Sequence, residues 1–225
     1  GGLTPSDVPL VSVTQDDLEA LERRYPDATD VWPLAPLQSG MFFHSVLAED
    51  AVDVYTAQVV LDFQGTVDTG RLRGAAEALI ARHANLRTAF VPDDSGTAVQ
   101  VVVDHVALPW EELDLSGLSE TEREERMSSV LSEHRSARFD MSRPPLMRFL
   151  LIRTGENSYR FSISNHHILL DGWSMPLLMK DLLVLYATRG DGSVLPRVRG
   201  YRDFLGWLSE RDTDASRSAW AHALA

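Results

Sequence analysis

Two adjacent histidines lie in the stretch SNHHILLDGWS, residues 164–174, where three apolar residues separate His166 and His167 from Asp171 and Gly172. An imidazole with an ordinary pKa near ~6.5 can take up or release a proton close to neutrality. Gly172 permits a positive φ angle or a close approach of the backbone to a substrate. The helix expected to follow would offer partial positive charge at its N-terminus to a developing oxyanion. These residue types can therefore support proton transfer beside a stabilised negative charge.

Three interpretations of the histidine pair stay open at this point. A buried histidine with a backbone partner is often purely structural. A metal site is disfavoured, because adjacent side chains on an extended segment point to opposite faces and cannot easily reach one ion. In the catalytic interpretation, one imidazole faces a cavity as a base or hydrogen-bond acceptor. Its neighbour then turns inward to stiffen the loop, and Asp171 holds the backbone bend.

The composition of the 225 residues excludes several other classes of function. Lys and Arg number 21 against 33 Asp and Glu, and the net charge of −12 repels phosphate backbones and anionic lipids. We therefore expect neither nucleic acid nor membrane as a partner. The absence of cysteine excludes disulfides, thiolate zinc sites, iron–sulfur clusters and cysteine nucleophiles. The sequence has no nucleophile elbow, P-loop or dinucleotide-binding glycine motif. It also has no recognisable signal peptide or membrane span, so a cytoplasmic location is the default expectation.

The apolar pattern predicts the elements that must position these residues. Helical spacing predicts helices over residues 14–24, from about 36, and over 67–83, 119–139 and 177–186. Runs of β-branched and aromatic residues predict strands over residues 54–63, 86–90, 99–103, 146–153 and 158–165, the last two forming an antiparallel pair. The histidines end the last strand, and Ser174 is a suitable N-cap for the helix that follows. This order predicts an α/β (α+β) sandwich, with helices packed on one mixed sheet.

Three stretches together resemble a known family. HHILLDGWS resembles the HHxxxDG active-site motif of the condensation domains of nonribosomal peptide synthetases, whose fold is similar to chloramphenicol acetyltransferase. VWPLAPLQSGMFFHS, residues 31–45, resembles the first core motif of that family. RHANLRTAF, residues 82–90, resembles the second, although Ala84 and Asn85 depart from its usual pattern. Residues 1–12 resemble a linker that leaves an upstream carrier domain, and residues 13–225 resemble the N-terminal subdomain, with the C-terminal subdomain absent.

The resemblance implies a reaction and a set of partners. An acceptor aminoacyl amine attacks a donor aminoacyl or peptidyl thioester, and each is presented on the 4′-phosphopantetheine of a carrier domain. No metal and no directly bound cofactor is implied. The expected partners are the upstream donor and downstream acceptor carrier domains, the C-terminal lobe and an adjacent adenylation domain, as in antibiotic or siderophore biosynthesis. We expect little or no activity from this chain by itself, because the family's active site lies in a tunnel between two lobes.

The resemblance also implies roles for individual residues. His167 would accept or orient the proton of the attacking amine, either as a general base or as a positioning acceptor. His166 would be structural, and the N–H of Gly172 would lie near the thioester oxygen. Asp171 would be a structural anchor.

The ion-pair partner expected for Asp171 is Arg82 or Arg87. Trp173 and Ser174 are assigned to the substrate tunnel, although a tryptophan is more often a core residue. We expect structural or surface roles for the remaining histidines, which are His44, His83, His105, His134 and His222.

Three rival functions remain open on the sequence alone. An epimerisation domain uses the same HHxxxDG framework to move an α-proton. A non-catalytic carrier-docking module would keep the histidine loop as a vestige, which the intact motif disfavours. A free-standing acyltransferase acting on small CoA thioesters is disfavoured by the linker-like residues at the start of the chain.

Overall fold

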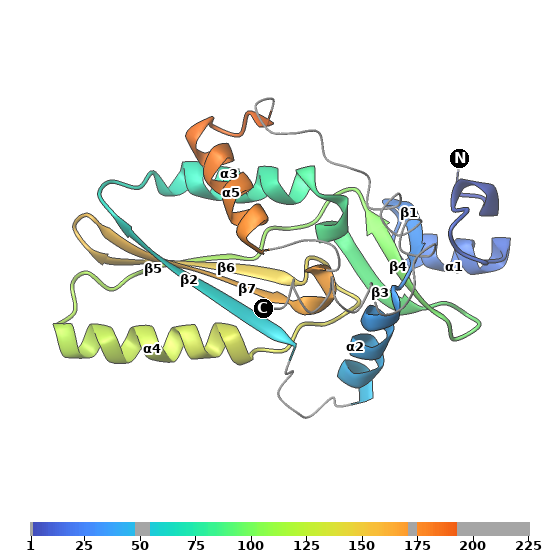
Figure 1. Cartoon of the computed structure of the whole chain (residues 1–225), viewed down its shortest axis with the longest axis horizontal. Helices are drawn as coiled ribbons and strands as arrows, with labels where there is room; N and C mark the ends of the chain where they lie inside the picture. Colours follow the sequence, from blue (N-terminus) through green and yellow to red (C-terminus); the bar gives the residue numbers. More distant parts are fainter. Residues whose placement is uncertain (1, 48–54, 171–174, 193–225) are drawn as a thin grey trace.

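The structure is a computed structural model, and it describes residues 2–47, 55–170 and 175–192. Its strands form two sheets with helices packed around them (Figure 1). The four-stranded sheet has the order β2 (Thr56–Gln64), β7 (Ser158–His166), β6 (Met147–Gly155) and β5 (Trp110–Asp114). The three-stranded sheet has the order β1 (Ala28–Pro33), β4 (Ala98–Val103) and β3 (Thr88–Pro92). The expected α/β class is confirmed, but the strands divide into two sheets where one was expected.

The expected helices are present with small changes at their ends. They are α1 (Gln15–Arg24), α2 (Pro36–Leu47), α3 (Thr69–Arg82), α4 (Glu120–Ser136) and α5 (Met175–Ala187). In α1 and α4, a capping box satisfies the first backbone N–H groups, through Thr14 with Asp17 and Ser119 with Glu122. None of the helices in the described part of the chain is long and apolar enough to cross a membrane.

The four-stranded sheet is covered by helices on both faces, with α3 and α5 on one side and α4 on the other (Figure 1). This explains the uninterrupted apolar run in β6. Phe149 and Leu151 belong to the core under α3 and α5, whereas Leu150 and Ile152 pack with α4. Because side chains alternate along a strand, successive residues of a strand that is covered on both faces can all be apolar, as residues 149–152 are. The parallel β5–β6 pair makes the sheet mixed, while β6 and β7 are antiparallel, as expected.

The three-stranded sheet forms a second core with the start of the chain. Val31, Val99 and Val101 of this sheet pack with Leu18 of α1 and with Val8, which has no exposed surface. Residues 2–12 therefore fold against α1, partly through the short 3-10 helix η1 (Pro5–Asp7). Their role as a connection to an upstream carrier domain remains a prediction.

Candidate active site

The two histidines lie where β7 ends between its neighbouring strands. His166 is the last residue of β7, and its N–H donates to the carbonyl of Leu146 at 3.0 Å. His167 begins the 3-10 turn η3 (His167–Leu170), and its N–H donates to the carbonyl of Tyr55 at 2.8 Å. Because Leu146 precedes β6 and Tyr55 precedes β2, bonds to both sides of β7 fix this backbone. His166 is completely buried, whereas His167 is partly exposed.

His166 is held by hydrogen bonds at both ring nitrogens. Its Nδ1 accepts from the N–H of Ile168 at 3.1 Å, so the ring proton is assigned to Nε2. Nε2 lies 3.3 Å from the hydroxyl oxygen of Ser45 on α2 and donates to it in this tautomer. Tyr55 packs beside the imidazole, with its ring centroid 6.2 Å away. The His166 ring therefore connects the histidine turn to α2 inside the core.

Two side-chain amides bind successive carbonyls of the η3 turn. Gln38 of α2 donates from Nε2 to the carbonyl of Ile168 at 2.8 Å. Asn85, in the 3-10 helix η2 (Ala84–Arg87), donates from Nδ2 to the carbonyl of Leu169 at 3.2 Å. Both side chains are buried, and so are Ile168 and Leu169. The backbone after His167 is thus fixed by two segments that lie far away in the sequence.

Gln38 is itself oriented by the three-stranded sheet. Its Oε1 accepts from the N–H of Ala35 at 2.9 Å and from Nε2 of Gln100 at 3.1 Å. Gln100 lies in β4, is 1% exposed, and also donates to the carbonyl of Pro33. The sequence pattern did not assign Gln38, Asn85 or Gln100 to the site. The available signal was a glutamine inside an apolar run, since a buried polar side chain requires hydrogen-bond partners.

The two arginines expected near Asp171 have other partners in the described part of the chain. Nε of Arg82 lies 3.9 Å from Oδ2 of Asp181 on α5. The guanidinium of Arg87 donates to four backbone carbonyls, those of Ile80, Ala81, Val103 and Asp104. Asp171 lies outside the described residues, so its pairing with either arginine remains a prediction.

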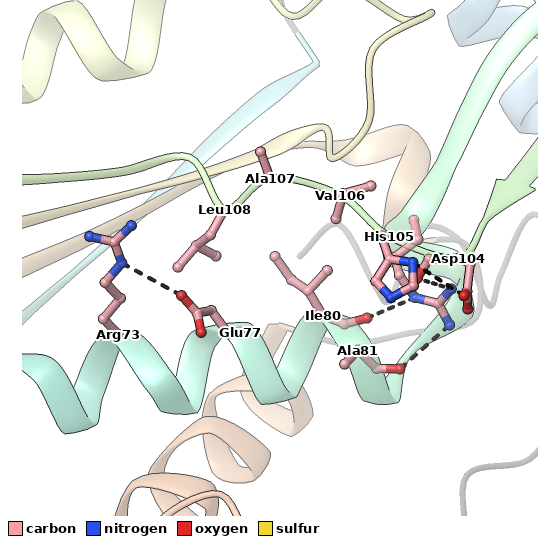
Figure 2. Close-up of a pocket in the computed structure, with 10 residues that line it drawn as sticks. Arg73, Glu77, Ile80, Ala81, Asp104, His105, Val106, Ala107 and Leu108 are labelled. Atoms are coloured by element: carbon pink, nitrogen blue, oxygen red, sulfur yellow. Dashed lines mark hydrogen bonds and ion pairs between the residues drawn. The ribbon is translucent and has the colours of Figure 1, made fainter. Parts of the chain in front are cut away.

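Arg87 also lines a hollow of about 490 Å³ between α3 and residues 104–108 (Figure 2). Figure 2 shows the ion pair between Arg73 and Glu77 on the α3 side of this hollow, with Nε and Oε1 3.6 Å apart. His166 and His167 are not among its lining residues. The hollow is therefore a surface feature separate from the histidine turn.

His83 connects α3 to α5, the helix that follows the histidine loop. Its Nε2 lies 3.0 Å from Oδ2 of Asp181, and its side chain is only 1% exposed. Burial lowers the pKa of His83 below its ordinary value, and the hydrogen bond to Asp181 opposes that shift in part. Arg82 and His83 thus contact α5, while Asn85, two residues further along, binds the η3 turn that precedes α5 in the sequence.

The remaining site residues and histidines have different positions. Gly172, Trp173 and Ser174 lie outside the described residues together with Asp171, and so does His222; their assigned roles remain predictions. The rings of His44 and Tyr55 form a T-shaped pair, His105 is exposed beside Asp104, and His134 pairs with Glu111 at 2.6 Å. No group of three or more histidine and carboxylate side chains in the described part is placed to hold a metal ion.

Comparison with known sequences places the chain in a family. The family model "Condensation domain" matches residues 28–224. The chain is 35% identical to one of the linear gramicidin synthase proteins of Brevibacillus parabrevis over 226 aligned residues, which cover 100% of this chain and 3% of that protein. It is 32% identical to bacitracin synthase 3 of Bacillus licheniformis over 98% of this chain and 4% of that protein. The chain therefore spans only a small part of the relatives it matches.

Solved structures agree in fold. The cyclization-docking bidomain of the nonribosomal peptide synthetase EpoB from Sorangium cellulosum is 27% identical, with a TM-score of 0.68 over 89% of this chain and 41% of that chain. The starter condensation domain of rhizomide synthetase RzmA is 16% identical, with a TM-score of 0.70 over 84% of this chain and 47% of that chain. The expected chloramphenicol acetyltransferase-like fold is confirmed by these neighbours. Since the family model matches most of the residues, this chain belongs to the condensation-domain family of nonribosomal peptide synthetases.

Proposed function

We propose that this chain is the histidine-bearing part of a condensation domain that forms an amide bond in nonribosomal peptide synthesis. The amine of an acceptor aminoacyl group attacks the carbonyl carbon of a donor aminoacyl or peptidyl thioester. A carbon–nitrogen bond forms and the carbon–sulfur bond breaks. The proton lost by the amine ends on the sulfur that leaves, which gives the free thiol. The observation that carries this proposal is the position of His167, partly exposed at the start of a turn whose backbone is fixed on both sides of β7.

In this proposal His167 receives or orients the proton of the amine. An α-amino group has a pKa near ~7.7 to 8.0, so much of it is protonated at neutral pH and must lose a proton to attack. His166 has a structural role, because its two ring nitrogens bond to Ile168 and Ser45 inside the core. The resemblance of HHILLDGWS to the HHxxxDG motif supports Gly172 as an oxyanion donor and Asp171 as a loop anchor.

The substrates would arrive on the phosphopantetheine arms of two carrier domains. Tethering supplies a high effective concentration, so positioning can account for much of the rate. The second half of the tunnel would come from a C-terminal lobe, since the matched region covers only 47% of the solved rhizomide synthetase domain. We propose that an adenylation domain of the same assembly selects the amino acid to be joined.

The test is mass spectrometry of loaded donor and acceptor carriers, mixed with this chain or with a version extended to the length of a whole condensation domain. We expect dipeptide from the extended version and little from the chain alone. His167→Ala in the extended version should lower the rate by about 10²-fold or more. His105→Ala is the matched control, because His105 is exposed beside Asp104 and should leave the rate unchanged.

Two outcomes would overturn the proposal. The first is dipeptide formation by His167→Ala at the rate of the parent protein. The second is deuterium exchange at the donor α-carbon without any dipeptide, which would indicate an epimerisation domain. Binding of loaded carriers without acyl transfer would instead indicate a docking module.

A further inference from the structure

The turn that carries His167 is attached to the rest of the fold by side-chain amides. Gln38 and Asn85 donate to the carbonyls of Ile168 and Leu169, which are consecutive in the sequence. The two donors come from α2 and η2, on separate segments of the chain. A buried carbonyl without a donor costs free energy, so these bonds favour one position of the turn.

We propose that Gln38 and Asn85 are positioning residues that set the place of the His167 imidazole, an inference that rests on the proposed function of His167. They act through the backbone of Ile168 and Leu169 and do not touch the substrate. The N–H of Ile168 donates to Nδ1 of His166, so the same turn is held from the inside as well. A displacement of the turn would move the His167 imidazole away from the amine whose proton it receives or orients.

The direction of the Gln38 amide is determined by its neighbours. Its Oε1 accepts from two donors, the N–H of Ala35 just before α2 and Nε2 of Gln100 on β4, so the oxygen end faces these two residues. Its Nε2 is therefore directed to the carbonyl of Ile168. Through Gln100, which also donates to Pro33, the three-stranded sheet and the histidine turn share one buried network.

Asn85, which binds Leu169, belongs to a segment that also contacts α5. The hydroxyl of Thr88 donates to the carbonyl of Asn85 at 3.2 Å and holds η2 in place. The preceding residues, Arg82 and His83, contact Asp181 on α5. Residues 82–85 therefore contact the chain before residues 171–174, at Leu169, and after them, at Asp181.

The test uses Gln38→Glu and Asn85→Asp, which keep the shape of each side chain. An introduced carboxyl can donate to the turn only while it is protonated, whereas the ionised form only accepts. The matched control is Gln58→Glu on β2, because Gln58 donates to the carbonyl of Leu131 at 2.9 Å, away from the histidine turn. All three variants should be compared with the parent protein for amide hydrogen exchange and, in the extended domain, for kcat and KM.

We expect the Ile168 amide to exchange about tenfold faster than in the parent protein when the carboxyl of Gln38→Glu or Asn85→Asp is ionised. The ratio of the Ile168 exchange rate in the variant to that in the parent should return toward one as pH falls and the carboxyl regains its proton. In the extended domain kcat should fall by about tenfold with KM little changed, because substrate binding is intact and the imidazole is misplaced. Gln58→Glu should change neither the Ile168 exchange nor kcat.

Unchanged Ile168 exchange and unchanged kcat in both Gln38→Glu and Asn85→Asp would overturn the proposal. A decrease in kcat of the same size in the control Gln58→Glu would overturn it as well. If Gln38→Glu does not fold, Asn85→Asp decides. If the parent extended domain forms no dipeptide, the proposed function fails. The exchange of Ile168 still shows in that case whether the two amides hold the turn.

Discussion

The hydroxyl oxygen of Ser45 lies 3.3 Å from Nε2 of His166, although 121 residues separate them in the sequence. Because Nδ1 of the same ring accepts from Ile168, the proton lies on Nε2 and Ser45 is its acceptor. This contact joins the end of β7 to α2, the helix that also supplies Gln38. The inward-facing histidine is therefore part of the scaffold of the turn.

Replacement of Ser45 by alanine should weaken this scaffold. The buried Nε2–H of His166 would lose its acceptor, which costs about 1–3 kcal/mol in the free energy of unfolding. Urea denaturation followed by circular dichroism measures the change. Ser128→Ala on the exposed face of α4 is the control, and it should stay within about 0.5 kcal/mol of the parent. Equal effects of the two substitutions would show that the Ser45 contact adds no stability.

Arg71→Lys should loosen the packing of α5 on α3. The Arg71 guanidinium donates to the carbonyls of Tyr186 and Ala187 and lies 4.6 Å from the centre of the Tyr186 ring. A lysine cannot bind two carbonyls and stack in the same geometry, so we expect a loss of about 1–2 kcal/mol in the free energy of unfolding. Arg73→Lys on the same helix keeps an exposed ion pair with Glu77 and should change stability by less than about 0.5 kcal/mol. A thermal melt of both variants, with the Arg73 variant the less stable, would contradict this assignment.

Periodicity in the sequence predicted the elements whose burial pattern is regular. β6 and β7 were found as an antiparallel pair, because their apolar runs are bounded by a clear turn. β1 and β5 were missed. The β5 sequence, WEELD, carries three carboxylates and forms the edge of the sheet, so little of its face needs apolar residues. The division into two sheets depends on strand pairing between distant segments, which no local pattern contains.

The candidate site was predictable where residue type alone carries the chemistry. The histidine pair and the strand that ends at it could be predicted, since imidazoles and period-two alternation are both visible in the sequence. Gln38 and Asn85 could not be assigned, because their acceptors lie 130 and 84 residues away along the chain. The contact of Arg82 with Asp181 was missed for the same reason.

Phe161→Ala should be among the most damaging substitutions in the core. Phe161 of β7 is completely buried and stacks on Phe149 with ring centroids 6.0 Å apart, while Trp110 lies 5.7 Å away. Truncation leaves a cavity among these rings, and we expect a loss of about 3–5 kcal/mol in the free energy of unfolding. Phe43→Ala is the control, because Phe43 is 50% exposed and its removal leaves little empty volume. Denaturant unfolding measures both losses. A larger loss in the free energy of unfolding for Phe43→Ala than for Phe161→Ala would show that this aromatic cluster is not the centre of the core.

His83 should make the stability of the fold depend on pH. Burial lowers its pKa in the folded protein below the ordinary value of 6.5, so the unfolded chain binds the proton more readily. This contribution to stability is present above pH 6.5, and it is lost as pH falls below 6.5 toward the lower pKa of the folded state. The acidic side chains with lowered pKa values, such as Asp114 and Asp140, titrate at lower pH and affect a separate range.

His83→Gln removes the titrating group and keeps a side-chain N–H that can reach Asp181. We expect the variant to lose stability at neutral pH, since the fit of the imidazole is lost, but to show a flatter decline between about pH 6.5 and 5. His105→Gln is the control, because the side chain of His105 is 86% exposed and its replacement should preserve the slope of the parent protein. Melting temperatures measured across this pH range give the comparison. The same slope in His83→Gln as in the parent would mean that a group other than His83 controls the loss of stability in this pH range.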